Sequence, residues 1–392
     1  MLASLLIGAL IFTQAAMPTS SAPDVYVTNT LDGTVAVVNG TSVHTTIPVM
    51  DLRGVGTSPK ETALSPNGST LYTLSHANVP GKRFWITEIN TRTAKYTGRA
   101  PIDFTPYQFV VTPDGKQAFV RNHARITAVN LQTGKPTYLR NLFPIDETLS
   151  PDGRTLYVAE DNGDLLAVNT ATDAITTTLH NSNQDEAVAV SPDGKSVYVL
   201  SFSQVRVIDA ATNTVTATIP LPQTSVHGGR YHQHLAVTPD GQRLFAYTAG
   251  APTYSVVDLT NNSVLNTFTP QRGLRTLAFA PHGPLAYGTG SGIGYTIDTS
   301  TGAIDSTNTT AFTGGTHSIA LTSDDTKAMV TEEPTNTVTE IDIATNTAAA
   351  KIEVGLEPYG VSVDPDGHAF VANEVSSTVS VVDVATATVI NT

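Results

Sequence analysis

The chain has 392 residues, of which 34 are acidic and 21 are basic, so its formal net charge is −13. Only 14% of the residues are charged, and the shortage of Lys and Arg argues against nucleic acid or an anionic membrane as a partner, because both require clustered positive charge. Without cysteine the chain has no disulfide, no thiol catalysis and no Cys-ligated zinc, and 40% hydrophobic residues exclude a disordered chain.

The first residues predict export from the cytoplasm. Residues Leu2 to Phe12 form an apolar run that is too short to span a bilayer, and small and polar residues follow from Thr13 to Ala22. This pattern is typical of a secretory signal peptide, although no Lys or Arg precedes Arg53. A buried N-terminal helix is the alternative. We therefore expect a signal peptide or apolar segment at 1–22, a single folded domain at 23–392 without a transmembrane segment, and a secreted, periplasmic or cell-surface protein.

A turn of the form Ser/Thr-Pro-Asp-Gly recurs along the rest of the chain. Its proline, or the residue that replaces it in a degraded copy at Ser323, stands at Pro66, Pro113, Pro151, Pro192, Pro239, Pro281, Ser323 and Pro365. The copies at Pro66 and Pro281 have Asn67 and His282 in place of the Asp. Proline fixes φ, Asp caps the turn and Gly accepts a positive φ, so each copy predicts a tight hairpin between two strands.

A second hairpin alternates with the first. Runs of alternating polarity end in Asp or Asn and are followed by a Thr/Gly/Asn turn, at Asn39, Asn90, Asn130, Asn169, Asp209, Asp258, Asp298, Asp342 and Asp383. Alternation with a period of two predicts half-buried strands. Each repeat of roughly 40 to 45 residues thus contains four short antiparallel strands, which is typical of a β-propeller blade. The sequence predicts an all-β fold with a single propeller domain.

The motif Tyr26-Val27-Thr28-Asn29 resembles the one that gives the YVTN family of propellers its name. Near-copies stand at Tyr157-Val158-Ala159-Glu160 and Phe370-Val371-Ala372-Asn373. The resemblance, to YncE-like proteins among others, covers about Asp24 to the end of the chain. It implies a propeller fold and a secreted or surface-associated protein. Relatives in this group include lactonases, a streptogramin lyase, amine dehydrogenase subunits and haem d1 propellers, so the resemblance implies no single function.

The number of blades follows from the two hairpin series. There are eight turns of the Pro-Asp-Gly type but nine of the Asp/Asn type, and the surplus lies between Asp24 and Val49. This segment supplies a second, third and fourth strand without a first strand. We expect eight blades, with seven and nine as the alternatives.

A functional site is expected where the first strand of each blade begins, at one mouth of the central channel. The residues six positions before each turn form a predicted ring of Lys60, Tyr107, Ile145, Glu186, Gln233, Arg275, His317 and Tyr359. Neighbouring polar residues are Asp146, His232 and His234. Polar residues at a wet channel mouth need no function. The alternative is a ligand-binding or catalytic site built from converging acidic, basic and aromatic groups.

Two kinds of chemistry are open to these residues. Glu186 and His317 are candidates for a general acid/base pair, with Arg275 or Lys60 to hold an anionic substrate. His232 and His234 would point to the same face of a strand and could hold a divalent metal, with His227, His317 or Glu186 as the third ligand. A structural or ligand-contacting role is favoured for this H-x-H pair, because a metal site also needs a third ligand and supporting groups, and we expect no cofactor. A haem d1 role would need an axial His or Tyr, for which His317, Tyr107 and Tyr359 are available.

Several acids lie in the loops between second and third strands. They would form an acidic rim at the same mouth, made of Asp161, Asp164, Glu332, Glu333 and Glu374. The main hypothesis is therefore a secreted binding protein, expected to be a monomer, that holds a small molecule or a protein, with a cationic or neutral polar ligand favoured. The alternatives are an extracytoplasmic lactonase- or lyase-like enzyme and a structural module of a surface layer.

Overall fold

The computed structural model describes most of the chain from residue 25 onwards. The described residues are 25–29, 34–39, 42–49, 57–65, 69–77, 84–91, 93, 95–102, 105–106, 108–122, 124–139, 143–181, 185–201, 204–222, 233–248, 253–270, 274, 276–290 and 292–392. The expected signal peptide at 1–22 lies outside them. No helix in the described part is long and apolar enough to cross a membrane.

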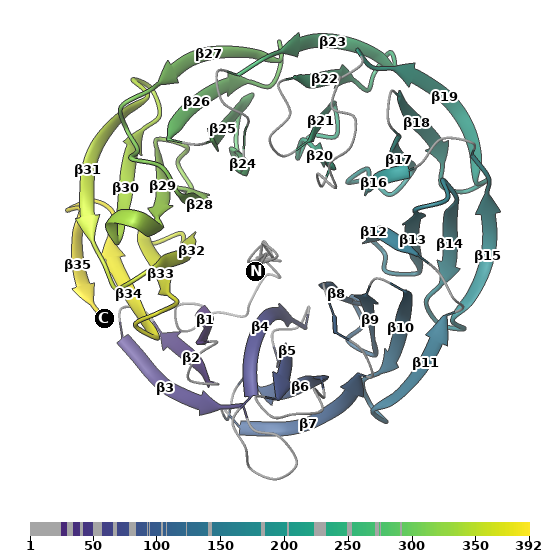
Figure 1. Cartoon of the computed structure of the whole chain (residues 1–392), viewed down its shortest axis with the longest axis horizontal. Coiled ribbons are helices and arrows are strands. Elements are labelled where there is room, and N and C mark those ends of the chain that lie inside the picture. The colour runs from purple at the N-terminus through teal and green to yellow at the C-terminus, as the bar shows by residue number, and fades with distance from the viewer. Residues whose placement is uncertain are drawn as a thin grey trace. The chain divides into compact units, whose positions relative to one another are not determined.

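The chain divides into two compact units, which we describe separately. The first consists of Met1–Ala118, Val129–Pro136 and Asn308–Thr392, and the second of Phe119–Ala128 and Thr137–Thr307. All sheets are antiparallel, and their strands are hydrogen-bonded in chain order (Figure 1).

The first unit contains one three-stranded sheet and three complete four-stranded sheets. The strands are β1 Val25–Asn29, β2 Thr34–Asn39 and β3 Ser42–Pro48; β4 Thr57–Leu64, β5 Thr70–Ala77, β6 Phe84–Asn90 and β7 Lys95–Ile102; β28 Thr316–Leu321, β29 Lys327–Glu332, β30 Thr337–Asp342 and β31 Thr347–Glu353; β32 Pro358–Val363, β33 His368–Asn373, β34 Thr378–Asp383 and β35 Thr388–Asn391. A 3-10 helix, η1 Glu333–Thr335, follows β29. The unit boundary passes through a further four-stranded sheet, made of β8 Gln108–Val111, β9 Gln117–Asn122, β10 Arg125–Asn130 and β11 Lys135–Leu139.

The second unit contains four complete four-stranded sheets. Their strands are β12 Pro144–Leu149, β13 Thr155–Glu160, β14 Leu165–Asn169 and β15 Ala174–Leu179; β16 Asp185–Val190, β17 Ser196–Ser201, β18 Gln204–Asp209 and β19 Thr214–Pro220; β20 Gln233–Val237, β21 Arg243–Thr248, β22 Tyr254–Asp258 and β23 Ser263–Phe268; β24 Thr276–Phe279, β25 Leu285–Gly290, β26 Ile293–Asp298 and β27 Ala303–Asn308.

The turns between first and second strands form as their sequence predicts. At the turn between β16 and β17, the Ser191 hydroxyl donates to Asp193 Oδ1 at 2.7 Å, and the Lys195 N–H donates to the same oxygen at 3.0 Å. Gly194 has φ +72°, a conformation that glycine adopts without steric cost. In the degraded copy, Thr322 donates to Asp324 at 2.6 Å, and Asp325 takes the glycine position with φ 59°.

The three-stranded sheet corresponds to the second, third and fourth strands of the others. Pairs of third and fourth strands share a register shift near the turn, as between Val207 and Ile208 in β18 and β19. The same shift occurs between Val37 and Val38 in β2 and β3, whereas β1 and β2 pair without one. Among the described residues, eight sheets have four strands, in agreement with the eight expected blades, and the N-terminal sheet shows the second, third and fourth strands that were predicted for it.

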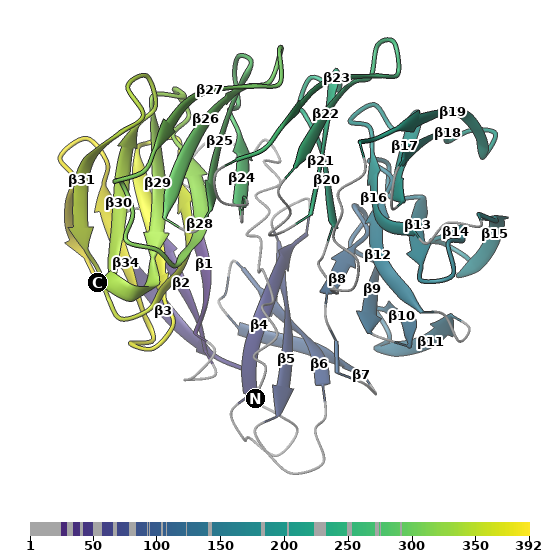
Figure 2. The same cartoon turned by 45° about the horizontal axis from the view of Figure 1, so that its top comes forward.

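Apolar side chains that alternate along the strands pack between neighbouring sheets of the same unit. In the first unit, Ala36 and Val38 on one face of the three-stranded sheet pack against Phe370, Val379 and Val381 of β33 and β34. On its other face, Val35 and Val37 pack with Leu71 and Ile89 of β5 and β6. Figures 1 and 2 both show β1–β3 beside β33 and β34. These contacts join the first and last sheets of the chain.

Candidate functional site

The best-defined polar cluster lies where β28 and β32 begin, entirely in the first unit. We call it the His317 site, and it consists of His317, Glu333, Tyr359 and Glu374. His317 and Tyr359 come from the first strands of adjacent sheets, and Glu333 and Glu374 follow the second strands of the same two sheets. The site therefore joins two members of the predicted ring to two members of the predicted acidic rim.

A carboxylate orients the imidazole of His317. Nε2 of His317 lies 2.7 Å from Oε2 of Glu333, and the side chains are 10% and 44% exposed, respectively. The backbone positions this pair, because the Glu333 N–H donates to the Gly315 carbonyl at 3.2 Å, just before β28. A buried imidazole held by a carboxylate can give or take a proton at a defined position.

His317 also contacts an aromatic ring. The ring of His317 stacks on that of Tyr359, with centroids 4.7 Å apart and planes inclined by 30°. The buried hydroxyl of Thr331 ties the two strands together, since it donates to the Tyr359 carbonyl at 2.9 Å and accepts the Ser318 N–H at 3.0 Å. The stacking distance is thus set by the backbone as well as by the rings.

The phenol of Tyr359 lies in a negative field. Burial raises the pKa of Tyr359, and the carboxylates of Glu374 and Glu333 raise it further because they disfavour a phenolate. The hydroxyl therefore stays protonated at neutral pH. The Glu374 N–H donates to the Glu357 carbonyl at 2.9 Å, which fixes the loop that carries Glu374.

Glu332 has a different role from the one predicted, since it is fully buried and not part of the rim. Its Oε2 accepts the N–H of Thr313 at 2.9 Å and the Thr313 hydroxyl at 3.1 Å. Its Oε1 accepts the hydroxyl of Thr339 and lies 3.3 Å from Nζ of Lys351. Glu332, the last residue of β29, is thus used for internal hydrogen bonds and an ion pair. Glu333, the first residue of η1, contacts His317 instead.

The structure describes few of the remaining predicted residues. Asp146 in the second unit is half-buried, and its Oδ2 accepts the Val188 N–H at 3.0 Å, so it links β12 to β16. Lys60, Glu186 and His234 lie in β4, β16 and β20, and the structure does not describe their side chains. Tyr107, His227, His232 and Arg275 lie outside the described residues. The acid/base role of Glu186 and the metal site thus stay predictions; among the described residues no group of three His, Asp or Glu is placed to hold a metal.

The contact between Glu333 and His317 is the feature that sequence reasoning missed. The signal was present, because Glu333 directly follows a second strand and His317 opens the first strand of the same sheet. The pairing of those strands brings Glu332 opposite Thr316, one residue from each member of the pair.

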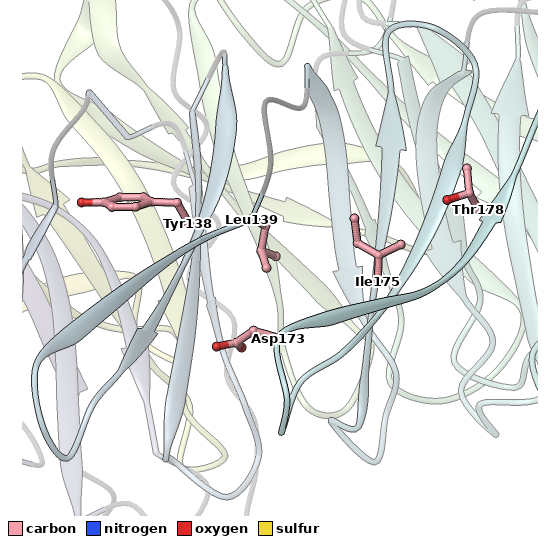
Figure 3. Close-up of a pocket in the computed structure, with 5 residues that line it drawn as sticks. All are labelled: Tyr138, Leu139, Asp173, Ile175 and Thr178. Atoms are coloured by element: carbon pink, nitrogen blue, oxygen red, sulfur yellow. The ribbon is translucent and has the colours of Figure 1, made fainter.

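The second unit contains a separate pocket of about 370 Å³ between β11 and β15. Figure 3 shows the residues that line it, which are Tyr138, Leu139, Asp173, Ile175 and Thr178. Arg125 lies 5.2 Å from the ring centroid of Tyr138, a cation–π contact that orients the ring. None of the described residues that line this pocket was predicted as a site residue.

No family model matches the sequence, and no curated protein matches it either. The YVTN resemblance is therefore supported at the level of fold alone. The solved structures that are similar include a hydrazine synthase of Kuenenia stuttgartiensis, with a TM-score of 0.50, 21% identity and coverage of 83% of this chain and 96% of that one. They also include the dihydro-heme d1 dehydrogenase NirN in complex with DHE, with a TM-score of 0.62, 17% identity and coverage of 89% of this chain and 77% of that one. Together with the repeated antiparallel sheets, they show that this chain has the all-β fold of a propeller.

Proposed function

We propose that this propeller is an extracytoplasmic binding protein that holds a small ligand at the His317 site. The observation that carries the proposal is the imidazole of His317, stacked on Tyr359 and held by Glu333. A pre-oriented polar group next to an aromatic surface is what a specific ligand site requires, because little freedom is lost on binding. The exported location rests on the apolar segment at Leu2 to Phe12.

A second candidate is acid–base catalysis by the same residues, of the lactonase or lyase type. It is favoured by the 2.7 Å contact between His317 and Glu333, because a carboxylate that orients an imidazole increases its value as a general base. The phenol of Tyr359, kept protonated, would be available as a proton donor. Turnover of lactones or uronates by the purified protein would favour this candidate over simple binding.

The similarity to NirN, a protein solved with DHE, raises the question of haem binding. The donor set at the His317 site does not fit an axial ligand in its present arrangement. Nε2 of His317 is engaged by Glu333, and its ring is covered on one side by Tyr359. Haem ligation by His317 through Nε2 would first have to break the contact with Glu333, so we propose no haem-dependent activity.

A fragment screen by NMR on the whole protein tests the proposed binding site. We expect hits that shift resonances of His317 and Tyr359 and that lose affinity at least tenfold in His317→Ala and Tyr359→Ala. The matched control is His368→Ala, since His368 also pairs with a carboxylate, Asp364 at 3.1 Å, but at a turn. Hits that bind both site variants as well as the wild type would refute the proposal, provided that the thermal unfolding temperatures are unchanged.

A further inference from the structure

Two exposed apolar side chains lie beside the His317 site. Leu356 is 50% exposed and Val375 is 42% exposed, whereas most of the large aliphatic residues that the structure describes are at least half-buried. The two loops are hydrogen-bonded to each other, because the Val375 N–H donates to the Leu356 carbonyl at 3.3 Å. Leu356 precedes Glu357 and Val375 follows Glu374, and the Glu374 N–H also donates to the Glu357 carbonyl at 2.9 Å, so the two loops that carry this apolar patch also carry two glutamates.

Among the described residues, the carboxylates near the patch have no Lys or Arg partner. In the part of the chain that the structure describes, no Lys or Arg forms an ion pair with Glu333, Glu357 or Glu374. By contrast, Glu332 pairs with Lys351 at 3.3 Å and Glu340 with Lys327 at 2.8 Å. The buried glutamates of these sheets are therefore neutralised internally, and those near the patch leave negative charge facing solvent.

An unsatisfied acceptor lies beneath the same loops. Asn373, which precedes Glu374, is 2% exposed, and its Nδ2 donates to the hydroxyls of Thr378 and Ser380 at 3.0 Å each. Its Oδ1 accepts no hydrogen bond from any described group. The carboxamide lies against the loop of Leu356, since a Cβ at Gly355 would come within 2.7 Å of it. A buried acceptor without a donor is costly and favours a ligand or water that supplies N–H or O–H groups.

We propose that the ligand of the His317 site is an organic ammonium ion that carries an apolar group. This inference rests on the proposed function and specifies its ligand class. The ammonium group would neutralise Glu374 and Glu333 and leave the Tyr359 phenol as a neutral neighbour, while the apolar group would cover Leu356 and Val375. An anion is disfavoured by the same carboxylates, and an inorganic cation would leave the apolar patch uncovered.

Four simple compounds separate charge from apolarity: n-hexylammonium, ethylammonium, hexanoate and hexan-1-ol. Their affinities for the whole protein are measured by calorimetry and located by NMR. We expect n-hexylammonium to bind at least tenfold more tightly than hexanoate or hexan-1-ol, and about tenfold more tightly than ethylammonium because of its longer apolar chain. Salt should weaken the binding of both ammonium ions.

Two variants test the two halves of the site independently. Glu374→Gln should weaken n-hexylammonium and ethylammonium alike, by about fivefold, as expected for loss of one partly exposed charge. Leu356→Ser should weaken n-hexylammonium and leave ethylammonium unchanged. The control is Glu353→Gln, which removes an exposed charge from β31 and should change neither affinity.

Equal binding of hexanoate or hexan-1-ol, no effect of Glu374→Gln, or n-hexylammonium shifts located elsewhere would overturn the inference. Its failure is distinguishable from failure of the proposed function. Fragments of another charge class that bind at His317 and Tyr359 would leave the binding site valid and refute only the ammonium ligand. If neither the ammonium ions nor the fragments perturb the site, both proposals fail.

Discussion

The two ends of the same sheets use their acidic residues in opposite ways. At the Pro-Asp-Gly turns, hydroxyl hydrogen bonds from Thr112, Ser150, Ser191 and Thr322 lower the pKa of the carboxyl groups of Asp114, Asp152, Asp193 and Asp324, respectively. At the opposite end, burial raises the pKa of Glu160, with a further contribution from Asp164, and burial and nearby carboxylates raise that of Tyr359. Local hydrogen bonds therefore favour the charged form of the first set of groups, whereas burial and nearby negative charge favour the neutral form of the second.

The largest expected effect on stability comes from Glu332, the buried residue that precedes Glu333 of the His317 site. Glu332→Ala should lower the free energy of unfolding by about 3 kcal/mol, because it leaves Lys351 and the hydroxyls of Thr313 and Thr339 without their acceptor. Urea denaturation measures the change. The double variant Glu332→Ala with Lys351→Met should recover part of the loss; an additive result would show that the ion pair itself is unimportant.

A smaller loss is expected where the two strands of the site are joined. Thr331→Val removes the hydrogen bonds to the Tyr359 carbonyl and from the Ser318 N–H and should cost about 2 kcal/mol. The ring resonances of His317 and Tyr359 should shift as the stack loosens. Unchanged ring shifts with the same loss of stability would mean that the stack is held by the rings alone.

At the turn end, Ser191→Ala should cost about 1 kcal/mol and raise the pKa of Asp193 from about 2 towards its ordinary value of 3.8. Because the folded-state pKa lies below that of the unfolded chain, the stabilisation from Asp193 is present above about pH 4 and is lost as the pH falls towards 2. Denaturation between pH 5 and pH 2 should therefore be less pH-dependent in Asp193→Asn than in the wild type. Identical pH profiles of the two proteins would show that Asp193 does not contribute to the pH dependence of stability.

The smallest effect concerns ionisation at the opposite end. Tyr359 should titrate above the ordinary tyrosine pKa of 10.0, and Glu374→Gln should lower that pKa because one of the nearby negative charges is removed. The difference in ultraviolet absorption between each protein and its Tyr359→Phe counterpart isolates this group. A pKa that is insensitive to Glu374 would weaken the case for a negative field at the site.

The repeats were predictable because their information is local. In five of the eight copies, a Ser or Thr, an Asp two residues later and a Gly or its substitute specify the turn, as Thr322, Asp324 and Asp325 do even without proline or glycine. Counting back from those turns correctly placed His317 and Tyr359 at the starts of adjacent first strands.

The chemistry between these strands depends on side-chain direction, which residue spacing does not specify. The register of β28 and β29 shifts between Thr316 and Ile319, next to His317. The chain then turns into η1 after Glu332, which sends that glutamate inward and Glu333 to the imidazole. Glu333, and not Glu332, therefore belongs to the His317 site, and this local irregularity of the backbone could not be read from residue spacing.

The three-stranded sheet also bears on how the chain reaches its folded state. Val38 near the beginning of the chain packs with Phe370 and Val381 near its end, so the first unit depends on contacts between residues more than 300 positions apart. Contacts of such high sequence separation form slowly, because a long loop must close before they are gained. On the ribosome, β1–β3 would emerge long before β33 and β34, whereas β12–β27 need only segments that follow one another closely. We therefore expect the second unit to fold during synthesis and the unit that carries the His317 site to be completed last.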